Sequence, residues 1–218
     1  MTIDLDTDVR PRTVRLRADA SRNRERIVSA AREAIVENGP DMALDDVARR
    51  AGVGNATLYR HFADRTALIR QVTLSVMART TQLAEDALAE EPDTFAALTR
   101  FVFAAVGERI GALCPLLYDA FDQPDPEVAA QMERMERSIT AIVVRAQRDG
   151  QLRGDIAIGD LMVALTQLTR PLPGVACVDF ERFVGRHLRL FLDGLRAPAR
   201  SELGGSPATL DDLKGCLK

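Results

Sequence analysis

The 218-residue chain has no tryptophan, two tyrosines and three cysteines. Cys114, Cys177 and Cys216 are far apart and odd in number, which disfavours a disulfide framework or a metal cluster. No apolar run approaches the roughly 18 residues that a membrane-spanning helix needs. The opening MTIDLDTD lacks the basic and apolar segments of a signal peptide. We therefore expect a cytoplasmic protein that has no membrane partner.

Residues with catalytic or metal-binding chemistry are also scarce. The two histidines, His61 and His187, have no metal-ligating neighbour at helical spacing. The sequence contains no nucleophile elbow, no P-loop and no metalloprotease motif. These absences argue against an enzyme, including one with an all-helical fold, and they predict neither a cofactor nor a metal site.

Lysine is nearly absent, and arginine carries the positive charge unevenly along the chain. The formal net charge is −3, and the only lysines are Lys214 and Lys218. Residues 9–70 contain 13 Arg against 8 Asp or Glu, whereas residues 71–218 contain 16 basic and 21 acidic residues. A basic head on an acidic body is the charge distribution expected of a DNA-binding module joined to a sensor domain.

Apolar residues recur three and four positions apart through most of the chain, which predicts an all-α fold. Proline and glycine clusters separate the predicted helices. After residue 63 these helices cover approximately residues 64–88, 93–113, 115–121, 128–149, 160–170 and 179–196.

The stretch LDDVARRAGVGNATLYRHF, residues 44–62, carries the strongest functional signal. Apolar residues in its first half recur at helical spacing, and Gly52 stands where a left-handed residue ends a helix. In its second half Leu58 and Phe62 face inward, which leaves a dense set of polar side chains on the other faces. Two short helices joined by a glycine turn are the signature of a helix-turn-helix. The alternative is ordinary packing of two helices in a bundle. The second helix is short and polar, which favours the interpretation that it binds in a DNA groove.

Residues 24–69, RERIVSAAREAIVENGPDMALDDVARRAGVGNATLYRHFADRTALI, strongly resemble the DNA-binding domain of the tetracycline-repressor (TetR) family. The AGV turn, TLYRHF and the DR-TAL segment are the most specific parts. The later FLDGLR is similar to the SbtR-like subgroup of C-terminal domains. The resemblance implies an N-terminal three-helix domain with helices at about Asn23–Asn38, Leu44–Ala51 and Asn55–His61. It also implies a helical-bundle C-terminal domain for ligand binding and dimerisation.

The resemblance assigns DNA contacts residue by residue. The N-terminal end of the third helix faces the bases, Tyr59 and His61 match phosphate-contacting positions, and Asp64 is placed to cap the fourth helix. Ala43 replaces a common Thr and removes a hydroxyl cap from the second helix. The implied DNA-binding residues are Leu44, Gly54, Asn55, Ala56, Thr57, Tyr59, Arg60, His61 and Arg65. Gly54 and Asn55 depart from the family's usual Ser and basic residue, so the operator of a relative does not transfer to this chain.

Four segments follow from these observations. Residues 1–20 are expected to be a disordered basic arm that follows a phosphate backbone or enters the minor groove, or equally a solvated tail. Residues 21–82 form the DNA-binding domain, with the helix-turn-helix at about 43–62. Residues 83–197 form the regulatory and dimerisation domain, and residues 198–218 form a flexible tail.

In the family a small-molecule effector binds among the middle helices of the C-terminal domain, and the last two helices pair in a homodimer. Apolar stripes are more often core than pocket, but such pockets are mostly apolar with a few polar groups. We expect the lining to consist of Phe101, Ala105, Leu117, Tyr118, Phe121, Met135, Ile139, Leu165 and Gln167, with Tyr118, Gln167 and Thr166 as polar candidates.

The function expected from the sequence is therefore a homodimeric transcriptional repressor that binds a palindromic DNA operator and is released by an unknown effector. A twofold dimer presents two recognition helices to two half-sites. The sequence leaves open a DNA-binding dimer without a small-molecule ligand.

Overall fold

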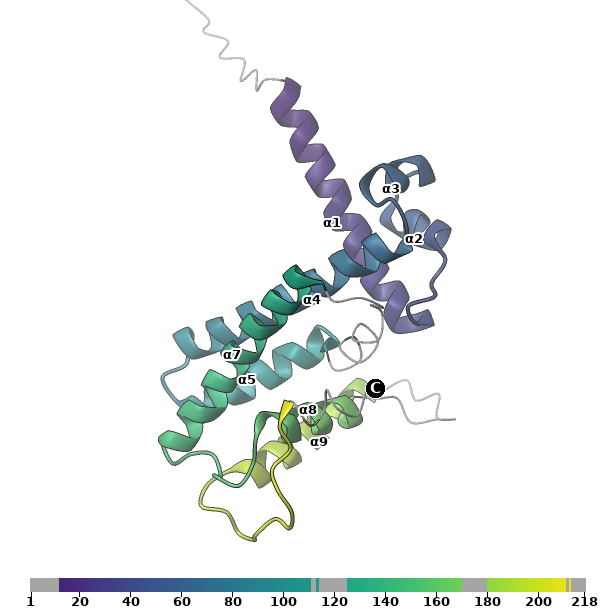
Figure 1. The fold of residues 1–218 in the computed structure, drawn as a ribbon. Helices are drawn as coiled ribbons and strands as arrows, with labels where there is room; N and C mark the ends of the chain where they lie inside the picture. Colours follow the sequence, from purple (N-terminus) through teal and green to yellow (C-terminus); the bar gives the residue numbers. More distant parts are fainter. Residues whose placement is uncertain (1–11, 111–112, 114–124, 170–179, 211, 213–218) are drawn as a thin grey trace, which may run out of the picture. The chain divides into compact units, whose positions relative to one another are not determined.

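The computed structural model describes residues 12–110, 113, 125–169, 180–210 and 212 (Figure 1). Over these residues the chain forms eight helices and no strand, which confirms the all-α prediction. The helices are α1 (Arg12–Asn38), α2 (Leu44–Ala51), α3 (Asn55–His61), α4 (Arg65–Glu90), α5 (Thr94–Gly107), α7 (Pro126–Arg148), α8 (Ile158–Leu168) and α9 (Phe180–Leu195).

The chain divides into two compact units, residues 1–72 and 73–218. The division falls inside α4, between Val72 and Thr73, rather than at residue 82 as the sequence suggested. Because the helical pattern of α4 continues across the division, the local sequence does not show where the two units meet. Each unit has buried apolar residues of its own.

In the first unit, α1 packs against α2, and α2 leads into α3 (Figure 1). Ile27, Ala31, Ala34 and Ile35 of α1 are fully buried, as their spacing predicts. Gly39 ends the helix in the left-handed region with φ 77°, and its N–H donates to the Ile35 carbonyl at 2.8 Å.

Helix α1 begins at Arg12, so the prediction of disorder is wrong for residues 12–20. The sequence has neither glycine nor proline between residues 12 and 38, and nothing therefore interrupts the helix. Pro11 stands directly before the first helical residue, where the missing N–H costs no helical hydrogen bond. The remainder of the expected arm, residues 1–11, lies outside the described residues.

In the second unit, α5 packs against α7 and α9, and α8 packs against α7 and α9. Asp93 caps α5 by accepting from the Ala96 N–H at 2.6 Å, and Asp125 caps α7. Burying a large apolar side chain contributes about 1.5–3 kcal/mol, so the core dominates the stability of this unit. Its largest fully buried side chains include Phe95, Leu98, Phe101, Leu113, Ile142, Leu161 and Leu188.

The connection after α7 is fixed by Gln151. Its Oε1 accepts from the Thr94 hydroxyl at 2.6 Å and from the Phe95 N–H at 2.8 Å. Its Nε2 donates to Asp93 Oδ2 at 2.7 Å. One side chain therefore satisfies three polar groups at the start of α5 and ties that helix to the end of α7.

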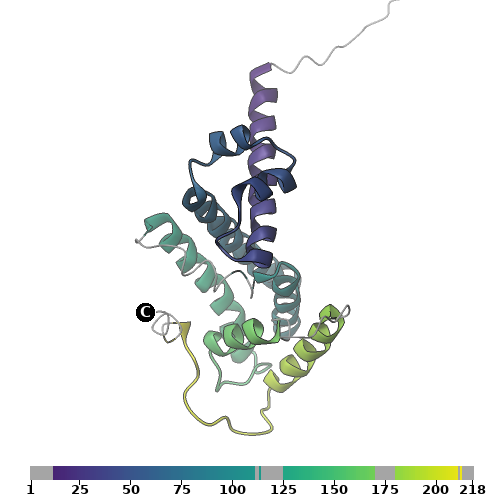
Figure 2. The ribbon, with the colours of Figure 1, turned by 90° about the vertical axis from the view of Figure 1, so that its right-hand side faces the viewer.

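The segment after α9 is docked, so the prediction of a flexible tail is wrong for residues 198–210. From the end of α9 the yellow chain runs back beside α8 (Figure 2). Arg153 donates to the Ser201 carbonyl at 2.7 Å, and the Ala208 N–H donates to Asp160 Oδ1 at 3.1 Å. A segment rich in Gly, Pro and Ser can thus be held by its backbone groups, which composition does not reveal.

Candidate functional site

The turn between α2 and α3 has the geometry that the sequence predicts. Gly52 lies in the left-handed region (φ 62°, ψ 39°), and the N–H of Val53 donates to the Ala48 carbonyl at 3.0 Å. A Cβ on Gly52 would also meet the Arg26 guanidinium at 2.5 Å. Both helices have the predicted bounds, and Ala43 supplies no side-chain cap to α2, as expected.

Helix α3 buries one face and presents the other to solvent. Leu58 and Phe62 are buried, whereas Tyr59 is 51% exposed. The exposed face therefore has the shape and chemistry of a surface that can contact phosphates and base edges. Of the predicted DNA-binding residues, Gly54, Asn55, Ala56, Tyr59, Arg60 and Arg65 are exposed, and Leu44, Thr57 and His61 are half-buried.

His61 differs from the other predicted contacts. Its Nε2 is buried and has no hydrogen-bond partner among the described residues. A phosphate contact therefore has to use Nδ1 or a different orientation of the ring. Asp64 behaves as predicted, since its Oδ1 accepts from the Ala67 N–H at 2.7 Å at the start of α4.

Several arginines of the first unit are engaged with acidic side chains. Arg50 donates to Glu37 at 2.7 Å and to Asp46 at 2.7 Å. The hydrogen bond from Arg50 lowers the pKa of Asp46, and Arg49 pairs with the same carboxylate. Arg60 has no ion pair among the residues that the structure covers, so its charge is available to a phosphate. The charges of Arg49 and Arg50 are therefore partly neutralised by acidic side chains of the same unit.

Asn55, the first residue of α3, has a partner that sequence reasoning missed. Its Nδ2 donates to Asp45 Oδ1 of α2 at 2.8 Å. Both side chains are exposed on the same surface as Tyr59. The sequence contained a weak signal for this pair, because Asp45 and Asn55 each lie in the first turn of a helix on either side of a tight turn.

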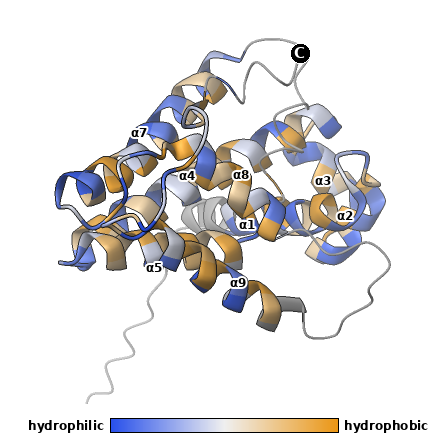
Figure 3. Ribbon diagram, turned by 90° about the horizontal axis from the view of Figure 1, so that it is seen from below, coloured by the Kyte–Doolittle hydropathy of each residue, from blue (hydrophilic) through white to orange (hydrophobic). Residues whose placement is uncertain are grey.

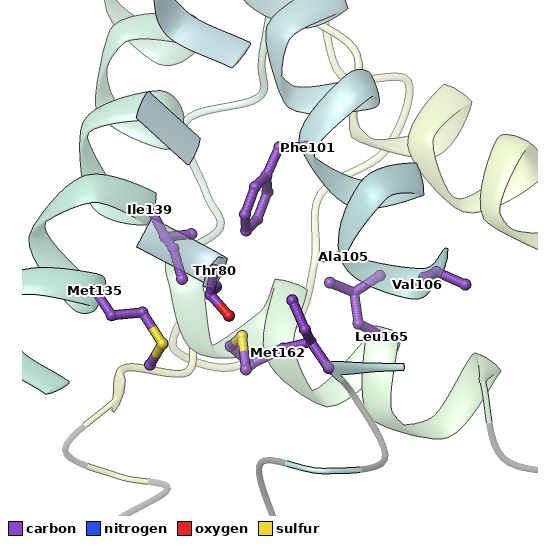
Figure 4. Close-up of a pocket in the computed structure, with 9 residues that line it drawn as sticks. Thr80, Phe101, Ala105, Val106, Met135, Ile139, Met162 and Leu165 are labelled. Atoms are coloured by element: carbon purple, nitrogen blue, oxygen red, sulfur yellow. The ribbon is translucent and has the colours of Figure 1, made fainter. Parts of the chain in front are cut away.

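The second unit contains an apolar cavity between α4, α5, α7 and α8 (Figure 4). Phe101, Ala105, Met135, Ile139 and Leu165, which are among the residues expected in an effector pocket, line this cavity. Thr80, Val106, Ile110 and Met162 also line it, although they were not predicted from the sequence.

Gln167 does not line the cavity, so that prediction is wrong. It is exposed, because it lies two residues beyond Leu165 and hence on the opposite side of α8. Thr166 is not part of the lining either. The predicted residues Leu117, Tyr118 and Phe121 lie outside the described part of the chain.

The cavity is small and nearly free of polar groups. Its volume is about 20 Å³, enough for about one water molecule but far below the roughly 300 Å³ of a small-molecule site. Among the described lining residues, Thr80 supplies the polar side-chain group, and its hydroxyl donates to the Val76 carbonyl at 2.8 Å. Met135 and Met162 have flexible side chains that can repack around a guest.

Helices α8 and α9 contain many hydrophobic residues, drawn in orange in Figure 3, and some of the large ones are exposed. Val163 of α8 is 43% exposed, and Phe183 and Leu190 of α9 are 47% and 59% exposed. Phe183 and Leu190 are seven residues apart and therefore share one face of α9.

No group of three or more His, Cys, Asp or Glu residues is arranged to hold a metal ion within the described ranges. None of the described helices is long and apolar enough to cross a membrane. Cys114, Cys177 and Cys216 lie outside the described residues.

Two protein-family descriptions match this chain. "Bacterial regulatory proteins, tetR family" matches residues 27–72. "Transcriptional regulator SbtR-like, C-terminal domain" matches residues 91–197. The first matched range contains α2 and α3. The second contains α5, α7, α8 and most of the residues that line the cavity.

Individual relatives extend over most of the chain. The HTH-type transcriptional regulator UidR of Escherichia coli (strain K12) is 28% identical over 84% of this chain and 93% of its own length. The HTH-type transcriptional repressor LfrR of Mycolicibacterium smegmatis is 30% identical over 59% of this chain and 67% of its own. A crystal structure of a TetR transcription regulatory protein from Mycobacterium vanbaalenii is 32% identical, with a TM-score of 0.60 over 84% of this chain and 99% of that one.

Proposed function

Because the chain belongs to the TetR family of bacterial regulatory proteins, we propose that it is a homodimeric repressor that binds a palindromic operator and is released by a small apolar effector. The observation that carries this proposal is the exposed polar face of α3 beside the tight turn at Gly52. The name of LfrR, a repressor 30% identical to this chain, supports repression over activation.

Sequence choice would come from the N-terminal end of α3. Asn55 and Ala56 are exposed there, and a short helix can place such residues against the base edges of a major groove. Arg60 and Tyr59 would contact phosphates and fix the position of the helix on the duplex. Neutralised phosphates release counterions, so affinity should fall as the salt concentration rises.

Dimerisation would use α8 and α9. Val163, Phe183 and Leu190 expose apolar area that pairing with a second copy would bury. A dimer is also what DNA recognition requires, because α3 has seven residues and reads few base pairs alone. Two half-sites one helical turn apart need recognition helices about 34–36 Å apart.

Release would follow from differential binding of the effector. The cavity of about 20 Å³ must widen to accept a ligand, and the flexible Met135 and Met162 side chains make that possible. The effector then favours a widened conformer with a different separation of the recognition helices. A coupling of about 1–3 kcal/mol weakens operator binding roughly 5- to 150-fold, and DNA weakens effector binding by the same factor.

The test has two stages. The full-length protein is first used to select binding sequences from a random duplex library, and its mass in solution is measured. An inverted repeat bound by a dimer is expected. Compounds that raise the melting temperature are then titrated against the protein alone and the protein–operator complex. Equal affinity in the two titrations would contradict ligand-driven release.

A second candidate function is a dimeric regulator that has no small-molecule ligand. The small volume of the cavity favours this alternative, as does the fact that the one hydroxyl among its described lining residues is already hydrogen-bonded to the backbone. It predicts the same palindromic operator and the same dimer. It differs in that no compound lowers operator affinity, and filling the cavity by Ala105→Leu leaves regulation in cells unchanged.

A further inference from the structure

We propose that Asp45 is a specificity-determining residue, which orients the Asn55 carboxamide so that the pair selects adenine in each half-site. The inference rests on the proposed DNA-reading role of α3 and deepens it. Asn55 Nδ2 and Asp45 Oδ1 are 2.8 Å apart, and both side chains are exposed on the recognition surface.

The orientation of the amide follows from the chemistry of its partner. An ionised carboxylate only accepts hydrogen bonds, so Asn55 must turn its NH₂ group toward Asp45. The reversed amide would place two oxygens against each other. The Oδ1 atom of Asn55 is consequently directed away from Asp45, and the order of the two groups is fixed before DNA arrives.

This arrangement matches some bases and opposes others. In the major groove, adenine and cytosine present an exocyclic NH₂ donor, whereas guanine presents O6 and N7 and thymine presents O4. Asn55 Oδ1 and the second oxygen of Asp45 are both acceptors, so they favour an amine and repel a carbonyl. Nδ2 keeps one hydrogen that Asp45 does not use. That hydrogen can donate to N7, which makes adenine the base that satisfies both groups of Asn55.

The charge of Asp45 adds a second effect. Among the described residues it has no ion pair, whereas the neighbouring Asp46 is engaged by Arg49 and Arg50. An unpaired carboxylate facing DNA repels the phosphate backbone at every sequence equally. Asp45 therefore lowers the affinity for every duplex alike, and only the orientation that it gives to Asn55 raises the specificity, at one base pair.

Three variants of the full-length chain separate these effects. Asp45→Ala removes the acceptor and the charge, whereas Asp45→Asn removes the charge and replaces a group that only accepts by one that can accept from or donate to Asn55. Asn55→Ala identifies the base position concerned, as the one at which its selected sequences lose their preference. Glu33→Gln is the matched control, because it removes one negative charge from an exposed position on α1 in the same unit.

Each variant is used to select binding sites from a random duplex library at one salt concentration, and melting temperatures confirm folding. Wild type is expected to enrich adenine at the Asn55 position. Asp45→Ala should lower that preference about fivefold or more and leave other positions unchanged. Asp45→Asn should also lower the preference, because its carboxamide can donate to Asn55 Oδ1 and so no longer excludes the reversed orientation. Both Asp45 variants should bind nonspecific duplex more tightly than Glu33→Gln.

Two results would overturn the inference while leaving the proposed function intact. One is an unchanged base preference in Asp45→Ala, and the other is guanine or thymine at the Asn55 position in wild type. A library from which wild type enriches no sequence would instead overturn the proposed function itself. Loss of folding in Asp45→Ala leaves Asp45→Asn and Asn55→Ala to decide, since an unchanged preference in Asp45→Asn also contradicts the orienting role.

Discussion

Gly159 lies directly against the backbone of Ala208. A Cβ on Gly159 would meet the Ala208 carbonyl oxygen at 2.3 Å, which is closer than side-chain carbons approach other atoms. The neighbouring Asp160 accepts from the Ala208 N–H at 3.1 Å and from the Ala157 N–H at 2.8 Å. Gly159, which has no side chain, therefore lets the C-terminal segment approach the start of α8, and the Asp160 carboxylate holds the segment there.

Replacing Gly159 by Ala should release this segment. The added methyl group cannot be accommodated without moving backbone, so we expect a loss of stability of about 1–3 kcal/mol. Hydrogen exchange should accelerate at Ala208, and proteolysis after residue 198 should become faster. Gly107→Ala is the matched control, because a Cβ there has no neighbour within 4 Å. Equal protection of the segment in both variants would contradict the docking.

The Arg153–Asp155 ion pair should make the stability of the fold depend on pH. Arg153 is 6% exposed and donates to both oxygens of Asp155, at 2.6 and 2.8 Å. These bonds hold the pKa of Asp155 at about 2, below its ordinary 3.8. Because the folded state lowers this pKa, the pair stabilises the fold above about pH 4, and that contribution disappears as the pH falls toward 2.

The measurement is urea unfolding of wild type and Asp155→Asn between pH 6 and pH 2. Wild type should be the more stable protein at pH 6, and the difference should shrink as the pH falls through the range from 3.8 to 2. A difference that stays constant over this range would show that the Asp155 charge is not responsible. Asp149→Asn, on an exposed residue at the end of α7, is the control.

Tyr59 and Arg60 should affect operator binding differently. Arg60→Ala removes a positive charge, so affinity should fall for all sequences and the salt dependence should weaken by about one ion. Tyr59→Phe removes one neutral hydrogen bond, which costs about 0.5–1.5 kcal/mol and leaves the salt dependence unchanged. Binding isotherms at several salt concentrations separate the two. An unchanged affinity in both variants would remove these residues from the proposed interface.

A substitution of Leu190 tests whether α9 forms the dimer interface. Placing a charge at an apolar interface position should weaken association by about 2 kcal/mol or more, roughly 30-fold in Kd. Leu190→Glu should therefore sediment as a monomer at concentrations at which wild type is dimeric, and its operator affinity should fall. Val144→Glu is matched to it, because Val144 is a 54% exposed apolar residue on α7 rather than on α9. Dissociation by Val144→Glu alone would place the interface elsewhere.

The local parts of the fold could be read from the sequence because local patterns encode them. The bounds of α2 and α3 follow from an apolar period and from one glycine that ends a helix at φ 62°. The buried Leu58 and Phe62 follow from their spacing of four. Five lining residues of the cavity were found for the same reason, since inward positions on amphipathic helices are periodic.

Features that depend on distant residues could not be read in this way. Gln151 caps a helix that begins 57 positions before it in the chain, and no sequence pattern pairs it with Thr94. Gln167 was assigned to the cavity from its chemistry, although its angle around α8 places it in solvent.

The sequence by itself determined that this chain is helical, that residues 44–62 form a helix-turn-helix, and that the TetR family is its family. Helix periods, a glycine turn and a family motif are properties of neighbouring residues. Tertiary structure alone decided that residues 198–210 dock on α8, and that Asp45 accepts a hydrogen bond from Asn55. Both contacts are hydrogen bonds between groups that the fold brings together. The positions of these residues in the sequence do not show that the groups are close in space.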